Sequence, residues 1–99
     1  MLYWVIYDIS NNGIRAKVAS KCKNYGLRRV QKSAFIGELT KNRAEMLAME
    51  VESILGDSDA VFVMPSCEEC FGGKIVSGDF DEDGIRKKDF VIVGGSNEG

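Results

Sequence analysis

The spacing of hydrophobic and polar residues predicts a strand followed by a helix in the first quarter of the chain. Residues Leu2–Ile9 are a continuous run of mainly aromatic and β-branched residues, which is typical of a buried strand. A polar cluster follows, and apolar residues then recur at helical spacing from Ile14 to Tyr25. Gly26 comes next and suits the left-handed conformation that commonly ends a helix.

The middle of the chain predicts an extended region, a second helix and another strand. Residues 27–39 read as extended structure, either a hairpin that turns near residues 31–33 or a single bent strand, because no typical turn dipeptide decides between them. Thr40 is a suitable N-cap for an amphipathic helix, and Gly56 is expected to end that helix. A further strand is expected from Asp59 to Met64.

The last quarter of the chain predicts two short strands with an acidic loop between them. Lys74–Val76 and Phe90–Val93 have the composition of short strands, and Asp79–Asp83 is expected to be a hairpin loop. The acidic segment resembles the start of a calcium-binding loop, but its twelfth position is Phe90 instead of the required glutamate.

The order β-α-β-β-α-β predicts an α+β ferredoxin-like sandwich, a single domain over residues 1–99 with an extra C-terminal strand within 79–99. In this fold two helices cover only one face of the antiparallel sheet. The first strand is nevertheless apolar on both sides, with Tyr3, Val5 and Tyr7 on one and Leu2, Trp4 and Ile6 on the other. Because a large bare apolar face is unusual on a monomer, we expect a symmetric homodimer that buries it.

Charge is distributed unevenly, although the formal net charge is only −2. Nine of the thirteen basic residues lie between Arg15 and Arg43, and ten of the fifteen acidic residues lie from Asp57 onward. Such a cationic region could contact phosphates, although a charged helix face is often simply solvated. The candidate contacts with nucleic acid are Arg15, Lys17, Arg28, Arg29 and Lys32, with Phe35 either stacking on a base, filling a dimer contact or packing in the core.

Composition also bears on location and on the cysteines. No stretch approaches the ~20 apolar residues that span a bilayer, and the chain starts without a basic leader. We therefore expect a cytoplasmic protein that does not associate with membranes. Cys67 and Cys70 have the spacing of zinc ligands, but with no second pair and no histidine the expected structure is a redox-inert turn.

Asp8 is the candidate metal ligand. The chain has no histidine, so hydrolytic chemistry would need a metal ion in place of the most common general base. Asp8 lies at the end of a buried strand beside the cationic helix, and Mg²⁺ commonly takes one or two carboxylates together with water and phosphate. A two-fold axis could bring two copies of Asp8 together. The alternative is that Asp8 caps its own loop or pairs with Arg15.

Two segments carry a family resemblance when they are taken together. Tyr7–Ser10 follows the apolar first strand, and Arg28–Leu39 reads RRVQKSAFIGEL. At this spacing in a chain of this length they resemble the CRISPR-associated protein two (Cas-two) family, over residue 1 to about residue 76.

The resemblance implies a homodimer that acts in CRISPR adaptation as a magnesium-dependent endonuclease on RNA or double-stranded DNA. Asp8 matches the family's metal-binding, catalytic aspartate, and Arg15, Arg29 and Phe35 fall where the family places residues implicated in activity. Lys17 keeps the charge of a position often held by arginine, and the C-terminal strand is expected to pair with the partner subunit. A larger integrase, Cas-one, is the implied partner. The alternative is a non-catalytic dimeric scaffold that grips DNA between two integrase dimers.

Overall fold

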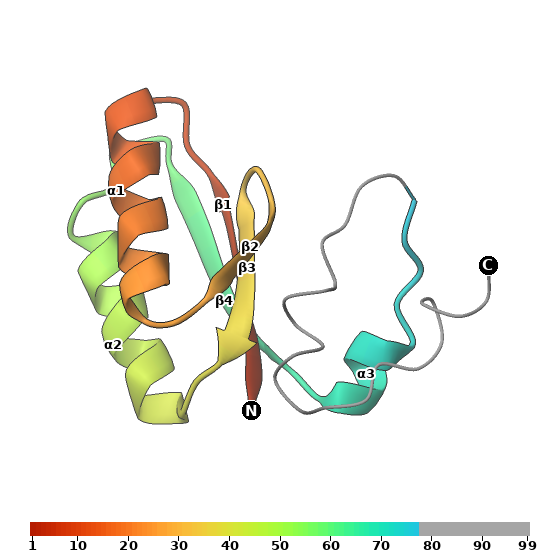
Figure 1. Cartoon of the computed structure of the whole chain (residues 1–99). Helices are drawn as coiled ribbons and strands as arrows, with labels where there is room; N and C mark the ends of the chain where they lie inside the picture. Colours follow the sequence, from red (N-terminus) through yellow and green to blue (C-terminus); the bar gives the residue numbers. More distant parts are fainter. Residues whose placement is uncertain (78–99) are drawn as a thin grey trace.

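The computed structural model describes residues 1–77. Over this range the chain folds in the predicted order β-α-β-β-α-β, followed by one additional short helix (Figure 1). The elements are β1 (Leu2–Asp8), α1 (Asn12–Asn24), β2 (Arg28–Gln31), β3 (Ala34–Glu38), α2 (Lys41–Glu52), β4 (Ala60–Ser66) and α3 (Glu68–Gly72). The predicted acidic loop at 79–83 and strand at 90–93 lie outside the described residues.

The strands form an antiparallel sheet in the order β2-β3-β1-β4, which is the ferredoxin-like arrangement. The extended segment after Gly26 proves to be a hairpin, because β2 and β3 pair across a turn at residues 32–33. β4 continues through Pro65, two residues beyond the predicted end of this strand. An edge strand tolerates proline because the missing N–H group can face away from the sheet.

α1 is capped by a residue of the polar cluster that precedes the predicted helix, and it ends just before the predicted glycine. Asn11 is its N-cap, and the side-chain oxygen accepts a hydrogen bond from the Ile14 amide at 2.8 Å. Gly26, just beyond the helix, has a φ of +83°, a left-handed conformation that costs glycine little.

α2 has the predicted start but an earlier end. Thr40 caps the helix by accepting a hydrogen bond from the Arg43 amide at 3.1 Å. The helix ends at Glu52, before the predicted stop at Gly56. The Ser53 hydroxyl donates to the Glu50 carbonyl at 2.7 Å, which satisfies one of the carbonyls left free at the helix end.

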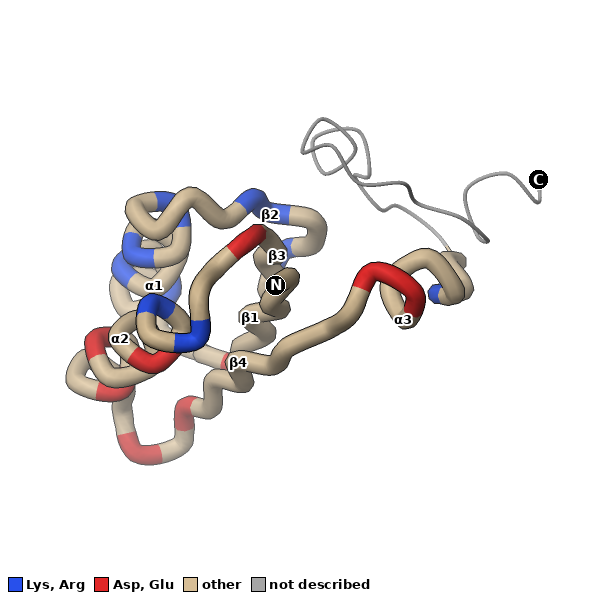
Figure 2. The backbone as a smooth tube through the Cα atoms, turned by 90° about the horizontal axis from the view of Figure 1, so that it is seen from below, with Lys and Arg blue, Asp and Glu red and all other residues tan. Residues whose placement is uncertain are grey.

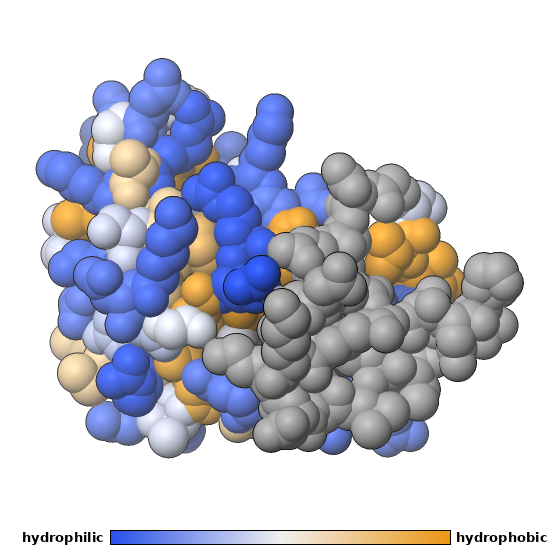
Figure 3. Space-filling view, viewed as in Figure 1, coloured by the Kyte–Doolittle hydropathy of each residue, from blue (hydrophilic) through white to orange (hydrophobic). Residues whose placement is uncertain are grey.

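The main core lies between the two long helices and one face of the sheet, and the outer surface of these helices is largely hydrophilic (Figures 1 and 3). β1 contributes the side chains predicted to share one face, and the helices contribute their apolar stripes. The fully or nearly fully buried members include Val5, Tyr7, Val18, Cys22, Phe35, Leu47 and Val51.

The opposite face of the sheet is also apolar, as predicted, and α3 covers part of it (Figure 1). Phe71 of α3 is buried in a second cluster, and its ring lies 5.8 Å from that of Trp4. The other buried members of this cluster are Leu2, Val30, Ala34 and Ile36. On β4, Phe62 and Met64 pair with Ile6 and Trp4 and share their face, but they stay 59% and 41% exposed.

The predicted strand at Lys74–Val76 is wrong. These residues follow α3, which the sequence did not predict, and have no regular structure. Ile75 is 94% exposed, so the short apolar run is not packed into the sheet. A run of three residues becomes a strand only where a neighbouring strand supplies hydrogen bonds, and none pairs with it within residues 1–77.

None of the helices within residues 1–77 has the length and apolar character needed to cross a lipid bilayer.

Leu47→Ala should lower the free energy of unfolding by about 2–5 kcal/mol, because it removes a fully buried side chain from the main core. Met49→Ala is the matched control, since Met49 lies on the same helix and is 70% exposed. Its effect should stay within about 0.5 kcal/mol. Urea denaturation followed by circular dichroism measures both changes, and equal losses for the two variants would contradict the described core.

Candidate nucleic-acid interface

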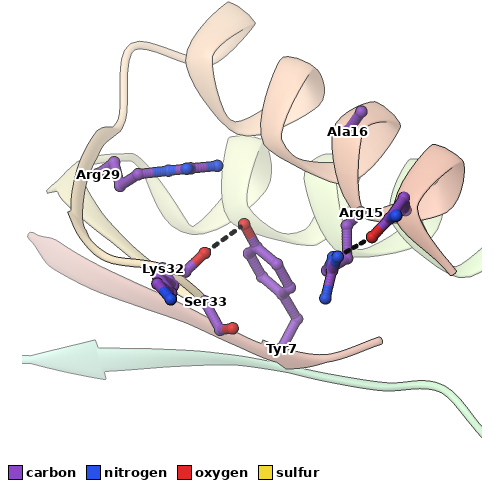
Figure 4. Close-up of a pocket in the computed structure, with 7 residues that line it drawn as sticks. Tyr7, Arg15, Ala16, Arg29, Lys32 and Ser33 are labelled. Carbon is purple, nitrogen blue, oxygen red and sulfur yellow. Dashed lines mark hydrogen bonds between the residues drawn. The ribbon is translucent and has the colours of Figure 1, made fainter. Parts of the chain in front are cut away.

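A cationic pocket of about 510 Å³ lies between the start of α1 and the turn that joins β2 to β3 (Figure 4). One lining residue comes from the end of β1, three come from the first turns of α1, and three come from β2 and the turn that follows it. The lining residues are Tyr7, Asn12, Arg15, Ala16, Arg29, Lys32 and Ser33. The fold therefore brings together side chains that are up to 26 positions apart in the sequence.

Tyr7 connects the pocket to the core. Its hydroxyl donates a hydrogen bond to the Lys32 carbonyl at 3.3 Å, and its ring stacks on Phe35 with the centroids 6.3 Å apart. Burial raises the pKa of the Tyr7 hydroxyl, although the charges of Arg29 and Arg15 partly oppose the rise. The hydroxyl therefore stays protonated at neutral pH and keeps its hydrogen to donate.

Phe35 supports the pocket from beneath but is not a contact residue. It is 0% exposed, so the sequence-based candidacy of its ring for stacking on a base is wrong, and the alternative of core packing is confirmed. The Arg29 guanidinium carbon lies 5.2 Å from the centroid of the Phe35 ring, within the range of a cation–π contact. Phe35 thus helps to hold Arg29 in position at the pocket.

Arg15 is held by polar contacts at the start of α1. One guanidinium nitrogen donates to the side-chain oxygen of Asn12, one turn before it on the same helix (Figure 4). Another nitrogen lies 3.5 Å from the Ile9 carbonyl, which directly follows β1. These contacts fix the guanidinium beside the junction of β1 and α1 while leaving it at the pocket wall.

The pocket has an excess of positive charge. Arg15, Arg29 and Lys32 line it together, and none of the lining residues in the described part of the chain carries a carboxylate. Within residues 1–77 none of these three cations forms an ion pair with an acidic side chain. Lysines and arginines lie mainly on α1 and around β2, and many of the acidic residues lie on α2 and beyond (Figure 2). A site of this character favours an anion such as a phosphate group.

The sheet separates the candidate phosphate contacts of β2, because they lie on its two opposite faces. Arg29 pairs with Phe35 and belongs to the helix-covered face, whereas Arg28 pairs with Ile36 on the opposite face. Successive strand residues point to opposite sides, so two adjacent arginines cannot line one pocket. Lys17 is exposed on α1 and is not among the lining residues.

Asp8 lies at the end of β1, where it pairs with Ala60 of β4. Alternation along the strand assigns it to the face of Trp4 and Ile6, opposite to Tyr7. Its carboxylate is exposed and makes no hydrogen bond or ion pair within residues 1–77.

The structural alternatives for Asp8 are therefore not realised in the described part of the chain. Asn11 caps the following helix, and Arg15 contacts the Ile9 carbonyl instead of the Asp8 carboxylate. No cluster of three or more acidic or cysteine side chains suitable for a metal ion occurs within residues 1–77. Among the described residues, Asp8 thus offers one carboxylate that is free to bind an ion.

Four lining residues are not candidates from the sequence: Tyr7, Asn12, Ala16 and Ser33. Tyr7 was assigned to the core, and its position next to Asp8 was the available signal for a second role. Asn12 and Ser33 gave no such signal, because their contribution depends on how the hairpin turn meets the start of α1. The hairpin alternative, with its turn near residues 31–33, puts Ser33 in the turn but does not predict that this turn meets α1.

Comparison with known proteins matches residues 1–73 to the family of CRISPR associated protein Cas2. The chain is 40% identical over 94 residues to the CRISPR-associated endoribonuclease Cas2 1 of Archaeoglobus fulgidus, which covers 94% of this chain and all of that protein. It is 46% identical over 65 residues to the CRISPR-associated endoribonuclease Cas2 of Korarchaeum cryptofilum, covering 65% of this chain and 70% of the relative.

A third relative joins two proteins in one chain. It is a CRISPR-associated endonuclease Cas1/endonuclease Cas2 fusion of Thermoproteus tenax, which is 46% identical over 57 residues. The match covers 54% of this chain and 22% of the fusion.

Solved structures agree with the assignment of the fold. A hypothetical protein of Thermus thermophilus superposes with a TM-score of 0.68 at 33% identity, covering 81% of this chain and 93% of that one. Streptococcus pyogenes Cas2 superposes with a TM-score of 0.61 at 23% identity over 68% of this chain and 87% of that one. The family match, the curated relatives and the ferredoxin-like sheet lead to one conclusion: this chain belongs to the Cas2 family of CRISPR-associated proteins.

Proposed function

We propose that this chain is a homodimeric, metal-dependent endoribonuclease of a CRISPR adaptation system, with Asp8 at its reaction centre. The observation that carries the proposal is that the Asp8 carboxylate, which has no partner within residues 1–77, shares a sheet face with exposed apolar residues. Burial of that face in a symmetric pair would bring two copies of Asp8 to one interface. The curated relatives, which are named endoribonucleases, favour RNA over double-stranded DNA as the substrate.

The homodimer is supported by the part of the apolar face that residues 1–77 leave uncovered. α3 packs Phe71 over the half of the face that carries Leu2 and Ile36. The half on β4 keeps Phe62 and Met64 exposed. Aromatic and methionine side chains are enriched in protein interfaces, and a second copy of the same patch is the simplest cover for them.

Mg²⁺ fits the donor set at Asp8 if two subunits contribute. One exposed carboxylate gives a weak site, but two carboxylates with water and a substrate phosphate give the hard oxygen ligands that Mg²⁺ prefers. When bound, the ion would supply an activated water and stabilise charge on the phosphate. Asp8 would hold the ion, and the chain has no histidine that could act as a general base without it.

The cationic pocket would orient the polynucleotide. Arg15, Arg29 and Lys32 can hold a backbone phosphate on the helix-covered side, while Asp8 lies on the other side of the same sheet end. The polynucleotide to be cut would therefore pass around the end of β1. Arg15 is well placed for this passage, since its guanidinium contacts the carbonyl of the residue that follows Asp8.

The second candidate function is a non-catalytic dimeric scaffold that holds DNA between two integrase dimers. The fused relative of Thermoproteus tenax supports the association with Cas1 that this function needs, because that protein carries Cas1 and Cas2 in one chain, although its name calls both parts endonucleases. Cas1 is accordingly the proposed partner under either function. The cytoplasmic location expected from the sequence is part of both proposals.

Asp8→Ala should reduce magnesium-dependent RNA cleavage by at least about a hundredfold, because it removes several kcal/mol of metal-dependent stabilisation of the transition state. Asp57→Ala, which removes an exposed carboxylate from the turn before β4, should cleave like the wild type. Labelled single-stranded RNA and duplex DNA measure both activities. Cleavage by Asp8→Ala at the wild-type rate would exclude Asp8, and an inactive wild type that still binds DNA would favour the scaffold.

Arg29→Gln should weaken nucleic-acid binding and make its dependence on salt shallower by about 0.7 for single strands, since one phosphate contact is lost. Glutamine keeps much of the side-chain stem over Phe35 and removes only the charge. Lys23→Gln is the control, because Lys23 is an exposed cation near the other end of α1. A fluorescence titration over a range of salt concentrations gives the dependence of the binding constant on salt. Equal dependences for Arg29→Gln and the wild type would show that Arg29 does not contact a phosphate.

Phe62→Glu should convert the dimer into monomers, because it puts a charge into the centre of the proposed interface. The side chain is 59% exposed in the single chain, so folding of the subunit should be unaffected. Met49→Glu, on the exposed surface of α2, should remain dimeric. Sedimentation velocity at micromolar concentration distinguishes the two, and a monomeric wild type or a dimeric Phe62→Glu would contradict the interface.

A further inference from the structure

Cys67 and Cys70 form a pair of exposed thiols at the start of α3, outside the cationic pocket and away from Asp8 in the sequence. Cys67 is the N-cap of the helix, and its sulfur accepts a hydrogen bond from the Cys70 amide at 3.2 Å. The first sulfur is therefore already directed at the residue that carries the second. The Cα atoms of residues three apart in a helical turn lie about 5 Å apart, within the Cα–Cα range of about 4.4–6.8 Å that a disulfide bridges.

We propose that Cys67 and Cys70 are a redox-active dithiol that closes to an intramolecular disulfide by exchange with an external low-molecular-weight disulfide. This inference goes beyond the proposed nuclease and scaffold functions and does not depend on either. It also replaces the inert turn expected from the sequence, which took account of spacing but not of the direction of the Cys67 side chain.

The surroundings of the two thiols give them different roles. Hydrogen bonds from the Cys70 amide and thiol lower the pKa of the Cys67 thiol. The hydrogen bond between the two side chains raises the pKa of the Cys70 thiol. Cys67 is thus the better nucleophile at neutral pH, and Cys70 is the resolving thiol. Exposure of both side chains gives an external disulfide access to them.

A metal site is the competing use of such a pair, and the described residues disfavour it. A tetrahedral zinc site needs four ligands, and no group of three or more potential ligands occurs within residues 1–77. The adjacent Glu68 and Glu69 do not complete such a group. Thiol–disulfide exchange, in contrast to a zinc site, needs only the two sulfur atoms of this pair.

The exchange balances with an external disulfide as the oxidant. The Cys67 thiolate attacks one sulfur of that disulfide, which forms a mixed disulfide and releases one thiolate. Cys70 then loses its proton to solvent and attacks the Cys67 sulfur, which forms the intramolecular bond and releases the second thiolate. The protein dithiol loses two electrons, the external disulfide gains them, and its two sulfurs leave as thiols once protonated.

The position of the pair connects its chemistry to the sheet. Phe71 follows Cys70 directly and is buried against the open face, so the dithiol lies at the start of the helix that covers part of that face. An intramolecular disulfide would fix the first turn of α3 in its folded conformation. Cys22 has no such role, because it is 0% exposed and burial raises its pKa to about 12.

Oxidised glutathione in excess provides the test on the full, folded chain, with free thiols alkylated afterwards and intact mass measured. In the wild type, two thiols should become inaccessible to the alkylating reagent at the same time. Before alkylation, the oxidised protein should weigh two hydrogen atoms less than the reduced protein and carry no glutathione. Cys70→Ser should retain one glutathione on Cys67, and Cys67→Ser should react more slowly than Cys70→Ser, because only the sulfur at position 67 accepts a hydrogen bond from the amide of residue 70. Buried Cys22 should stay alkylatable only after unfolding, and it serves as the internal control.

Three outcomes would overturn the proposal. The first is two stable glutathione adducts on the wild type, which would mean that the thiols act independently. The second is equal reaction rates for the two single variants, which would remove the distinction between nucleophile and resolving thiol. The third is purified protein that releases one zinc ion per two chains when its thiols are titrated, which would assign both cysteines to a metal shared between subunits.

Discussion

The structure depends on one constraint: the central strand β1 is apolar on both sides, so both faces of the sheet must be covered. The helices α1 and α2 satisfy this requirement on one side, where Val5 and Tyr7 join the main core. On the other side α3 inserts Phe71 and covers only part of the surface. The fold, the proposed dimer and the position of the cysteine pair all follow from the way in which this second face is covered.

The cationic pocket illustrates how a buried group can serve a surface site. Phe35 makes no contact with solvent, yet it stacks on Tyr7 and lies under Arg29. The core therefore supplies a firm base for a flexible, charged side chain and reduces the conformational freedom that binding would otherwise remove. A family resemblance alone assigns Phe35 to activity, and the geometry indicates that any such role is indirect.

The sequence was sufficient for the order of elements because hydrophobic period and capping residues agree with each other. Asn11 and Thr40 cap the helices in which the apolar stripes are found, and Gly26 adopts the predicted left-handed conformation. Local signals failed where a neighbour decides the outcome. Lys74–Val76 has the residues of a strand but no adjacent strand to bond with in the described chain.

The candidate site was predicted in its residue types but not in its arrangement. Net positive charge in the first half of the chain indicated a phosphate-binding surface, and Arg15 and Arg29 do line one pocket. The separation of Arg28 from Arg29 follows from the two-residue period of a strand. Which of the two arginines lies on the helix-covered face is known only from the pairing of β2 with β3. The same period separates Asp8 from Tyr7, so the family motif that joins them spans two faces of the sheet.

The turn at residues 32–33 is fastened to β1 at both of its residues. The Tyr7 hydroxyl donates to the Lys32 carbonyl, and the Tyr7 amide donates to the Ser33 carbonyl at 2.9 Å. Surface turns usually accept insertions and deletions readily. Here an added residue would pull one carbonyl away from its donor and widen the pocket wall, so evolutionary change in loop length should be confined to other connections of the fold.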